Sequence, residues 1–273
     1  MALISVAELS DLLIASEPDV IVCDVRFHLD DHDRGRREYD AAHLPRARFV
    51  DLHTELAGSD GGGRHPLPAV ADFAALLGRL GVRPGSMIVA YDDAGGATAS
   101  RLWWMLRSIG HGRAAVLDGG IQAWTAAGRE LTDIVPEVSA TVYPAAPDWT
   151  GTVDAEAVAQ SAALGGTVID ARAAERYRGD TEPIDARAGH IPGAVNRFHG
   201  DTVGLDGLHL PTEQLAEFFA GVGENPIVYC GSGVTACHDL LAMSTIGLAG
   251  ARLYPGSWSE WSADPGRAVA TGD

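Results

Sequence analysis

One cysteine of this chain, Cys230, stands at the end of a short apolar run and at the start of a loop of small residues. The surrounding segment, 228–239, reads VYCGSGVTACHD, and the residues from Cys237 onward have a helical pattern. A cysteine at the carboxyl end of a parallel strand would lie where α/β sheets bind their ligands. A thiolate at that place is a candidate nucleophile for covalent catalysis.

The loop after this cysteine contains glycine and other small residues, so its backbone can curl back toward the sulfur atom. We expect a nest of backbone N–H groups that binds an anion, formed by Gly231, Gly233, Val234 and Thr235. The positive end of the following helix also favours negative charge. Both effects favour the thiolate, and the same nest could hold the terminal sulfur of a persulfide. A structural cysteine before a glycine-rich turn is the alternative interpretation.

Four sequence blocks occur twice in the same order, which indicates an internal duplication. The matched pairs are VIVCDVR (20–26) with GTVIDAR (166–172), AAHLPRA (41–47) with AGHIPGA (188–194), MIVAYDDAGGATASRLWWML (87–106) with NPIVYCGSGVTACHDLLAMS (225–244), and LDGGIQAW (117–124) with LYPGSWSEW (253–261). On this alignment Asp93 takes the place of Cys230 in the first half. We therefore expect the first half to be a catalytically silent copy, and we favour the nucleophile over the structural cysteine.

Short apolar strands alternate with helical patterns in both halves of the chain. This alternation predicts an α/β fold of two tandem domains, each a mainly parallel sheet flanked by helices. Three prolines between residues 135 and 152 indicate an extended linker. The expected organisation is therefore a silent domain over 1–134, a linker over 135–152 and a catalytic domain over 153–273.

Composition and charge exclude several classes of function. A formal net charge of −17 argues against binding to nucleic acid or to an anionic membrane. No apolar run reaches the roughly 18–20 residues of a membrane helix. The first residues, MALISVAELSDLL, lack a basic head and read as an amphipathic helix rather than a signal peptide. These features predict a cytoplasmic protein that binds neither nucleic acid nor membrane.

The cysteines and histidines show no arrangement that is typical of a disulfide framework or of a metal site. The chain has three cysteines, which is an odd number, and no pair of them has the CxxC spacing. The ten histidines show no metal-ligand spacing either. We therefore expect neither a metal nor another cofactor.

In combination, the motifs resemble those of the two-domain rhodanese family of sulfurtransferases over nearly the whole chain. They are CGSGVTAC (230–237), DAR (170–172), ERYRG (175–179), TEP (181–183), GHIPGAVN (189–196) and GSWSEW (256–261), with HLP (43–45), RLWW (101–104) and LDGG (117–120) in the first half. The resemblance implies that the thiolate of Cys230 takes a sulfur atom from a small-molecule donor. A thiol acceptor such as thioredoxin, or cyanide in an assay, would then remove it from the persulfide.

Within this family, the loop after the cysteine indicates the sulfur donor. Members that prefer thiosulfate tend to carry basic side chains there, whereas Cys-Gly-Ser-Gly-Val-Thr is similar to the loop of the 3-mercaptopyruvate sulfurtransferases. Residues 231–236 contain no Lys or Arg. The resemblance thus implies 3-mercaptopyruvate as donor and pyruvate as product, and thiosulfate is the alternative donor. A non-enzymatic persulfide carrier is a further alternative, while a cysteine phosphatase would need Arg in place of Ala236.

Two arginines are candidates for binding the carboxylate of the donor. Arg176 matches the substrate-binding arginine of the family, and its guanidinium could form two parallel hydrogen bonds to a carboxylate. Arg187 is the candidate for a second such group, with Arg178 as the alternative.

The resemblance also implies a serine–histidine–aspartate relay that moves a proton to or from the substrate. Ser232 matches the serine, and His65 matches a histidine that precedes Leu-Pro in the first half. Asp51 is the candidate acid. The first half carries extra residues around His65, which could reach the loop of the second half. By contrast, His43 and His190 occur in both halves, which favours a structural role for them.

Overall fold

The computed structural model describes residues 2–15, 19–248 and 250–273 and divides into two compact units. The first unit comprises Met1–Gly58, Pro68–Thr150 and Leu205–His209, and the second comprises Ser59–Leu67, Gly151–Gly204 and Leu210–Asp273. The division near residue 150 falls within the segment 135–152 that we interpreted as a linker. Each half of the sequence also supplies one short segment to the unit that is formed mainly by the other half. No helix among the described residues is both long and apolar enough to span a membrane.

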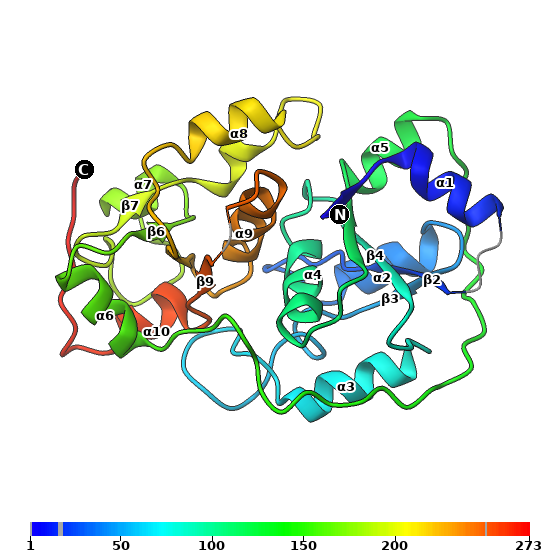
Figure 1. Ribbon diagram of the computed structural model, residues 1–273, viewed down its shortest axis with the longest axis horizontal. Helices are drawn as coiled ribbons and strands as arrows, with labels where there is room; N and C mark the ends of the chain where they lie inside the picture. Colours follow the sequence, from blue (N-terminus) through cyan, green and yellow to red (C-terminus); the bar gives the residue numbers. More distant parts are fainter. Residues whose placement is uncertain (1, 16–18, 249) are drawn as a thin grey trace. The chain divides into compact units, whose positions relative to one another are not determined.

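The first unit is built on a five-stranded parallel sheet in the order β1-β5-β4-β2-β3. Figure 1 labels three of its strands, β2, β3 and β4. Its elements are β1 (Leu3–Ile4), α1 (Val6–Ile14), β2 (Val20–Asp24), α2 (Arg34–Ala41), β3 (Ala47–Phe49), α3 (Val70–Arg79), β4 (Met87–Tyr91), α4 (Ala99–Ser108), β5 (Ala114–Leu117) and α5 (Gly120–Ala126).

The central strands of this sheet, β2, β4 and β5, are buried on both faces, as is usual when helices connect parallel strands. One face packs against side chains of three helices, including Leu9 of α1, Tyr39 of α2 and Trp124 of α5. Helix α4 covers the other face, where it contacts β4 and β5. All five residues of β2 are buried: four apolar residues, VIVC, lead to Asp24, and Cys23 belongs to the core.

The second unit repeats this plan with shorter strands, in the order β7-β6-β8-β9. A parallel bridge between Thr152 and Leu253 adds the position that β1 takes beside β5 in the first unit. The elements are α6 (Ala155–Ala163), β6 (Val168–Asp170), α7 (Ala174–Arg178), β7 (Val195–Asn196), η1 (His199–Thr202), α8 (Thr212–Phe218), β8 (Ile227–Tyr229), α9 (Ala236–Thr245), β9 (Arg252–Leu253) and α10 (Ser257–Ala263).

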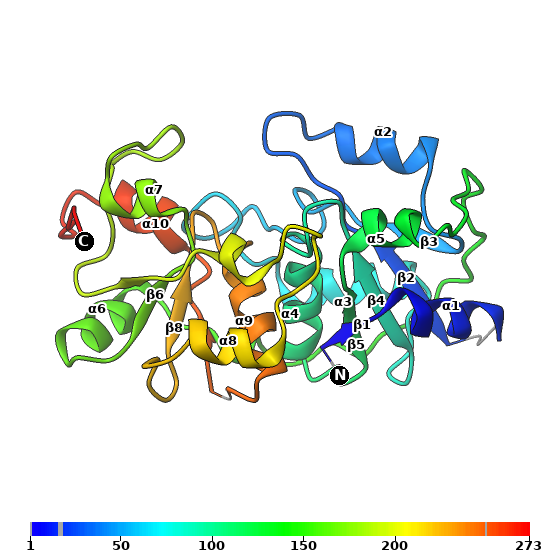
Figure 2. The same cartoon turned by 90° about the horizontal axis from the view of Figure 1, so that it is seen from above.

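The core of the second unit is again layered. Val158 of α6, Tyr177 of α7 and Trp258 of α10 pack on one face of the sheet. Helix α9 packs on the other face against β8, and α8 lies beside α9 (Figure 2). The fold class predicted from the sequence is thereby confirmed: each half forms a parallel sheet flanked by helices.

A buried ion pair stands at the same place in both sheets. Asp24 at the end of β2 accepts hydrogen bonds from Arg26, whose Nη2 lies 2.7 Å from Oδ2. Asp170 and Arg172 repeat the pair in the second unit at 2.6 Å. Each arginine also donates to a backbone carbonyl beyond the next helix, Arg26 to Ala42 and Arg172 to Gly189. Because an unpaired buried charge is costly, each pair ties the end of its strand to that later segment.

The histidines that recur in the two halves are buried and structural. The ring of His43 stacks on Tyr39 with centroids 4.0 Å apart, and His190 stacks on Tyr177 at 3.8 Å. In each case Nδ1 bonds the backbone carbonyl of the stacked tyrosine. The stacks show that α2 and α7 are equivalent and that Tyr39 corresponds to Tyr177.

Strand register corrects the predicted correspondence between the halves by one residue. Asp24 pairs with Tyr91 across β2 and β4, and Asp170 pairs with Tyr229 across β6 and β8. The residue that follows Tyr91, Asp92, therefore corresponds to Cys230, and the expectation of Asp93 at that position is wrong. The cause is a loop one residue longer before α4 than before α9, so that sequence matching from the helix side counts one position too far.

Candidate active site

Cys230 directly follows β8 and is almost entirely buried, with 2% of its surface exposed. Its backbone N–H donates to Oγ of Ser257 at 3.1 Å, and its Sγ accepts a hydrogen bond from the N–H of Gly233 at 3.1 Å. A hydrogen bond to sulfur favours the thiolate. One backbone N–H of the predicted anion-binding nest, that of Gly233, is thus bonded to the sulfur atom of Cys230.

The loop that holds this sulfur is tied to the start of α10. Trp258 N–H donates to the carbonyl of Cys230, and Ser259 N–H donates to that of Gly231, both at 2.9 Å. Gly233 has φ of +75°, and a Cβ on it would lie 2.5 Å from the carbonyl oxygen of Pro255. Only glycine fits this turn without displacing its neighbours.

The short segment 59–67 belongs to the second unit and brings His65 to the loop. His65 is 2% exposed, and its Nδ1 lies 2.9 Å from Oγ of Ser232. The segment is held by Arg64, whose backbone N–H donates to Oγ of Ser259 at 3.0 Å. The structure therefore brings together the serine and the histidine that the sequence suggested, 167 positions apart.

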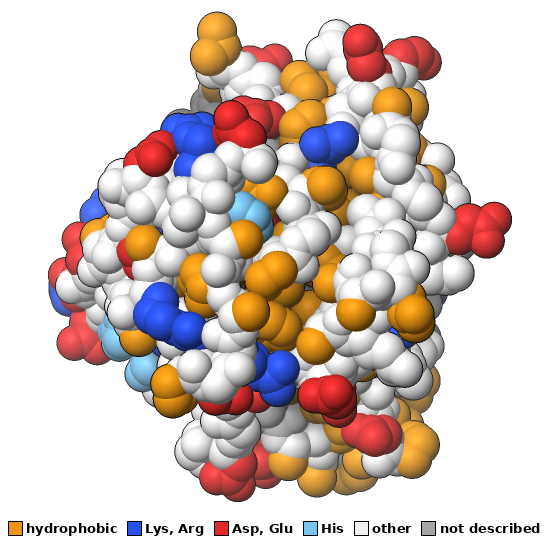
Figure 3. Space-filling model, turned by 90° about the vertical axis from the view of Figure 1, so that its left-hand side faces the viewer, with side chains coloured by type: hydrophobic (Ala, Val, Ile, Leu, Met, Phe, Trp, Pro, Cys, Tyr) orange, Lys and Arg blue, Asp and Glu red, His pale blue; other side chains and the backbone are white. Residues whose placement is uncertain are grey.

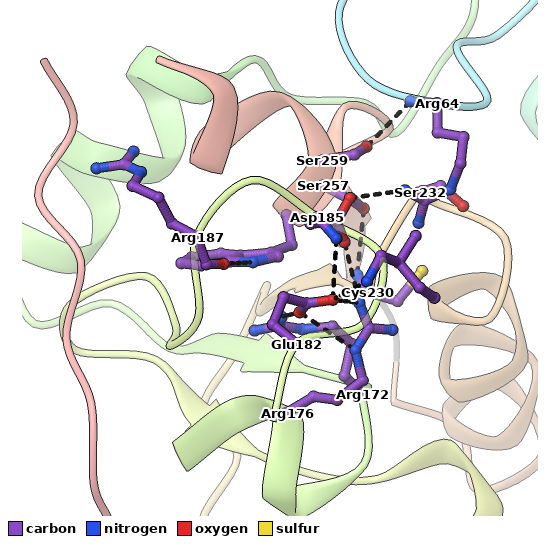
Figure 4. Close-up of polar contacts among 12 residues, drawn as sticks. Arg64, Arg172, Arg176, Glu182, Asp185, Arg187, Cys230, Ser232, Ser257 and Ser259 are labelled. Atoms are coloured by element: carbon purple, nitrogen blue, oxygen red, sulfur yellow. Dashed lines mark hydrogen bonds and ion pairs between the residues drawn. The ribbon is translucent and has the colours of Figure 1, made fainter. Parts of the chain in front are cut away.

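Two guanidinium groups converge beside the same loop (Figure 4). Asp185 joins them, since its Oδ1 accepts from Arg64 at 2.6 Å and its Oδ2 accepts from Arg176 at 2.9 Å. A Cβ on Gly231 would lie 3.1 Å from Nη2 of Arg64 and 3.5 Å from Nη1 of Arg176. Among the described residues, neither of these two nitrogen atoms is bonded to an acceptor, so both can bind an anion next to Cys230.

A second buried carboxylate, that of Glu182, links Arg176 to Arg172. Glu182 accepts from Arg176 at 2.6 Å and from Arg172 at 3.1 Å. Burial raises the pKa of Glu182, but the hydrogen bonds from Arg176 and from the backbone of Asp185 prevail and lower it below the ordinary value. Glu182 therefore stays charged and holds Arg172 and Arg176 in position.

Arg187 does not take the predicted role of a second carboxylate-binding arginine. Its guanidinium points away from Cys230 (Figure 4) and donates to the backbone carbonyls of Trp261, Ser262, Asp264 and Arg267. Those bonds use its donors to hold the end of α10. The alternative, Arg178, pairs with Asp180 at a partly exposed place. Arg64 supplies the second guanidinium instead.

The candidate acid of the relay, Asp51, lies in the first unit. Its Oδ1 accepts a hydrogen bond from Thr54 N–H at 2.9 Å, and its own N–H donates to Glu55. The carboxylate thus closes a short turn after β3, and a part for it in proton transfer stays a prediction.

The other two cysteines lie in surroundings that do not favour reaction. Burial raises the pKa of the Cys23 thiol to about 12. Cys237 is fully buried in the first turn of α9 and donates its S–H to the carbonyl of Gly233 at 3.3 Å. Nearby, burial and then the charge of Cys230 raise the pKa of Asp239 well above its ordinary value.

The first unit shows what the same loop does without a thiol. The carboxylate of Asp92 accepts backbone hydrogen bonds from Ala94, Gly96, Thr98 and Ala99 at 2.7–2.9 Å. The nest predicted for the second half thus exists here, and a side chain of the protein fills it. In this loop those four backbone N–H groups are bonded to Asp92 rather than directed at a free anion.

Sequence reasoning missed Arg64 and Asp185. Arg64 directly precedes His65, so the segment that delivers the histidine delivers a cation as well. A signal existed in Asp185, a lone acid in the stretch after TEP where the family resemblance suggested an arginine. Together the residues can bind a small anion, hold a sulfur anion at Cys230 and exchange a proton through His65 and Ser232.

Surface charge does not supply the attraction for such an anion. On the face seen in Figure 3, basic and acidic side chains are scattered among apolar and neutral atoms. With a net charge of −17, the chain repels anions at long range. Binding of an anion must therefore depend on the arginines inside the site.

Comparisons with known proteins agree with the motifs. The family described as Rhodanese-like domain matches residues 5–127 and 154–264. A Pseudomonas aeruginosa protein with the provisional name 3-mercaptopyruvate sulfurtransferase is 45% identical over 94% of both chains. A Mycobacterium tuberculosis protein with the provisional name thiosulfate sulfurtransferase SseB is 42% identical over 99% of this chain and 97% of its own. The solved structure of SseA from Escherichia coli, a 3-mercaptopyruvate sulfurtransferase, superposes with a TM-score of 0.83 at 31% identity, covering 94% of this chain and 99% of SseA.

The turn at Gly233 generates a test of the site's geometry. Gly233→Ala should slow alkylation of Cys230 by iodoacetamide about tenfold or more, since a hydrogen bond to a charged group is worth about 1.5–3 kcal/mol. Gly247→Ala is the matched control, because Gly247 has the same φ of +75° with nothing within 4 Å of an added Cβ. Equal alkylation rates in both variants would mean that the Gly233 N–H does not activate the sulfur.

Proposed function

The chain belongs to the rhodanese family, and on that premise we propose that it transfers sulfur from 3-mercaptopyruvate to a thiol through a persulfide on Cys230. The observation that carries this proposal is the pair of guanidinium groups, Arg64 and Arg176, that face Gly231 beside the buried sulfur atom. They provide a site for the carboxylate of a 2-oxo acid one residue from the nucleophile. The names of the P. aeruginosa relative and of E. coli SseA support the same donor.

The first half of the reaction forms the persulfide. The thiolate of Cys230 attacks the sulfur atom of 3-mercaptopyruvate, and the bond between that sulfur and carbon 3 breaks. The electron pair of this bond goes to the carbon as the enolate of pyruvate, which takes up a proton and leaves as pyruvate. The hydrogen bond from Gly233 and the dipole of α9 stabilise negative charge on the sulfur that remains.

Ser232 and His65 are placed to handle the proton. Their side chains bond each other at 2.9 Å, and both are buried. In this role His65 exchanges the proton with Ser232, whose hydroxyl passes it to the carbon or to the 2-oxo oxygen of the donor. Such a pair has no use in a carrier that only stores sulfur.

The second half of the reaction returns the enzyme to its starting state. The thiolate of an acceptor attacks the outer sulfur of the persulfide, and the electron pair of the sulfur–sulfur bond returns to Cys230. A dithiol protein such as thioredoxin is the acceptor that we propose. All three cysteines are free in the structure, which suits a reducing compartment and supports a cytoplasmic location.

Thiosulfate is the second candidate donor, since the M. tuberculosis relative is named for it. Both donors are anions, so the two arginines alone do not separate them. The loop favours 3-mercaptopyruvate, because residues 231–236 themselves supply no Lys or Arg for a second negative group. We therefore place thiosulfate behind 3-mercaptopyruvate.

Steady-state kinetics with both donors tests this choice. We expect kcat/KM to be about tenfold or more higher for 3-mercaptopyruvate, because a site built for one polar group rejects others on at least that scale. A higher value for thiosulfate would overturn the proposed donor.

Variants of the two arginines test the binding of the carboxylate. Arg176→Gln and Arg64→Gln should each lower kcat/KM for 3-mercaptopyruvate by about tenfold to a hundredfold, the range that corresponds to one charged hydrogen bond. Arg178→Gln is the control on the same helix, since Arg178 pairs with Asp180. If Arg178→Gln loses as much activity as the other two variants, Arg64 and Arg176 are not the residues that bind the carboxylate.

Removal of the histidine tests the proton transfer. His65→Ala should lower kcat by about a hundredfold or more, the usual contribution of a positioned acid or base. Ser232→Ala should have a similar effect, and the double variant should be little worse than either, because residues that act as a unit are not additive. Unchanged turnover in His65→Ala would remove the relay from the mechanism.

A further inference from the structure

The first unit contains a polar cluster beside the loop that begins at Asp92, which corresponds to the loop that begins at Cys230 in the second unit. Nε2 of His28 lies 3.2 Å from Oε2 of Glu38 and 3.5 Å from Oδ2 of Asp93. The three ligand atoms lie within 4.8 Å of one another, and each residue is partly buried. Among the described residues, this is the one group of three or more His, Cys, Asp or Glu side chains that meets those distances.

The position of the cluster follows from the duplication. Since Tyr39 corresponds to Tyr177, Glu38 takes the place of Arg176. Since Asp92 corresponds to Cys230, Asp93 takes the place of Gly231.

The charge of the pocket is thereby reversed between the two units. In the second unit, a Cβ on Gly231 would lie 3.5 Å from Nη1 of Arg176, the nitrogen atom of that guanidinium that is not bonded to an acceptor among the described residues. In the first unit, a carboxylate stands at each of these two positions, and His28 approaches both. A pocket with this inverted charge suits a cation.

The imidazole of His28 gives a chemical reason why a metal cation, rather than a hydrogen atom, would lie between the three side chains. One Nε2 atom carries at most one hydrogen, yet it faces oxygen atoms of two carboxylates, so a hydrogen bond can satisfy only one of them at good geometry. A metal ion in place of that hydrogen would bind all three atoms. Tetrahedral ligands at about 2.1 Å from Zn²⁺ are about 3.4 Å apart, which agrees with the two short distances of the cluster.

Neighbouring residues hold the ligands in place. Arg34 donates from Nε to Oε1 of Glu38 at 2.7 Å, which leaves Oε2 for the ion. The backbone carbonyl of Asp93 accepts from Gln122 at 2.7 Å. Such supports are usual around metal ligands and raise their affinity.

We propose that His28, Glu38 and Asp93 form a site for one divalent transition-metal ion in the first unit. The ligand set of one imidazole and two carboxylates fits Zn²⁺ and leaves one coordination position open. The spacing of these residues along the chain matches no metal motif, which is why the sequence suggested no metal.

Isothermal titration of Zn²⁺ into the full chain tests this site. The chain carries Cys230→Ser in every sample, so that the reactive thiol cannot bind the metal. We expect saturable binding of one equivalent, and Asp93→Asn should weaken it by about tenfold or more. His28→Gln should do the same by removing the single nitrogen ligand.

Asp33→Asn is the matched control, because Asp33 is exposed at the start of α2 and its side chain caps no backbone group. Its affinity for Zn²⁺ should equal that of the parent. Glu38→Gln keeps a good helix former in α2 and gives a third ligand variant. The proposal is overturned if no single equivalent binds, or if binding persists unchanged in the Asp93 and His28 variants.

Discussion

The site depends on a series of ion pairs between acidic and basic side chains, which begins in the core and ends beside the sulfur atom of Cys230. Asp170, Arg172, Glu182, Arg176, Asp185 and Arg64 follow one another, each joined to the next at 2.6–3.1 Å. Removing any buried member of this series would leave its partner unpaired. The series therefore fixes the guanidinium groups of Arg176 and Arg64 beside the loop that follows Cys230. A protein with a net charge of −17 can thus present positive charge at one point, where an anionic donor is expected.

Duplication has given this protein two similar loops with opposite uses. In the second unit the loop holds the sulfur of Cys230 through the N–H of Gly233. In the first unit the carboxylate of Asp92 receives the backbone hydrogen bonds of the loop and fills it. Around that loop, Glu38 and Asp93 stand where the second unit has Arg176 and Gly231. The scaffold is shared, while the charge around the loop differs between the two units.

Features that depend on local pattern could be predicted from the sequence, and features that depend on the path of a loop could not. The alternation of strands and helices gave the fold, and the glycine loop located Cys230. The motif before Leu-Pro identified His65, which lies beside Ser232. Arg64 was missed because no periodicity shows where the segment 59–67 packs. Arg187 was chosen by residue type, but carbonyls at the end of α10 take its hydrogen bonds.

Mass spectrometry of the protein after exposure to 3-mercaptopyruvate, with no acceptor present, shows whether Cys230 carries the transferred sulfur. We predict that the peptide containing Cys230 gains the mass of one sulfur atom, while the peptides containing Cys23 and no other cysteine gain none. Fragmentation would place the added sulfur on Cys230 rather than on Cys237. Sulfur found on Cys237, or pyruvate released with no sulfur retained on the protein, would contradict it.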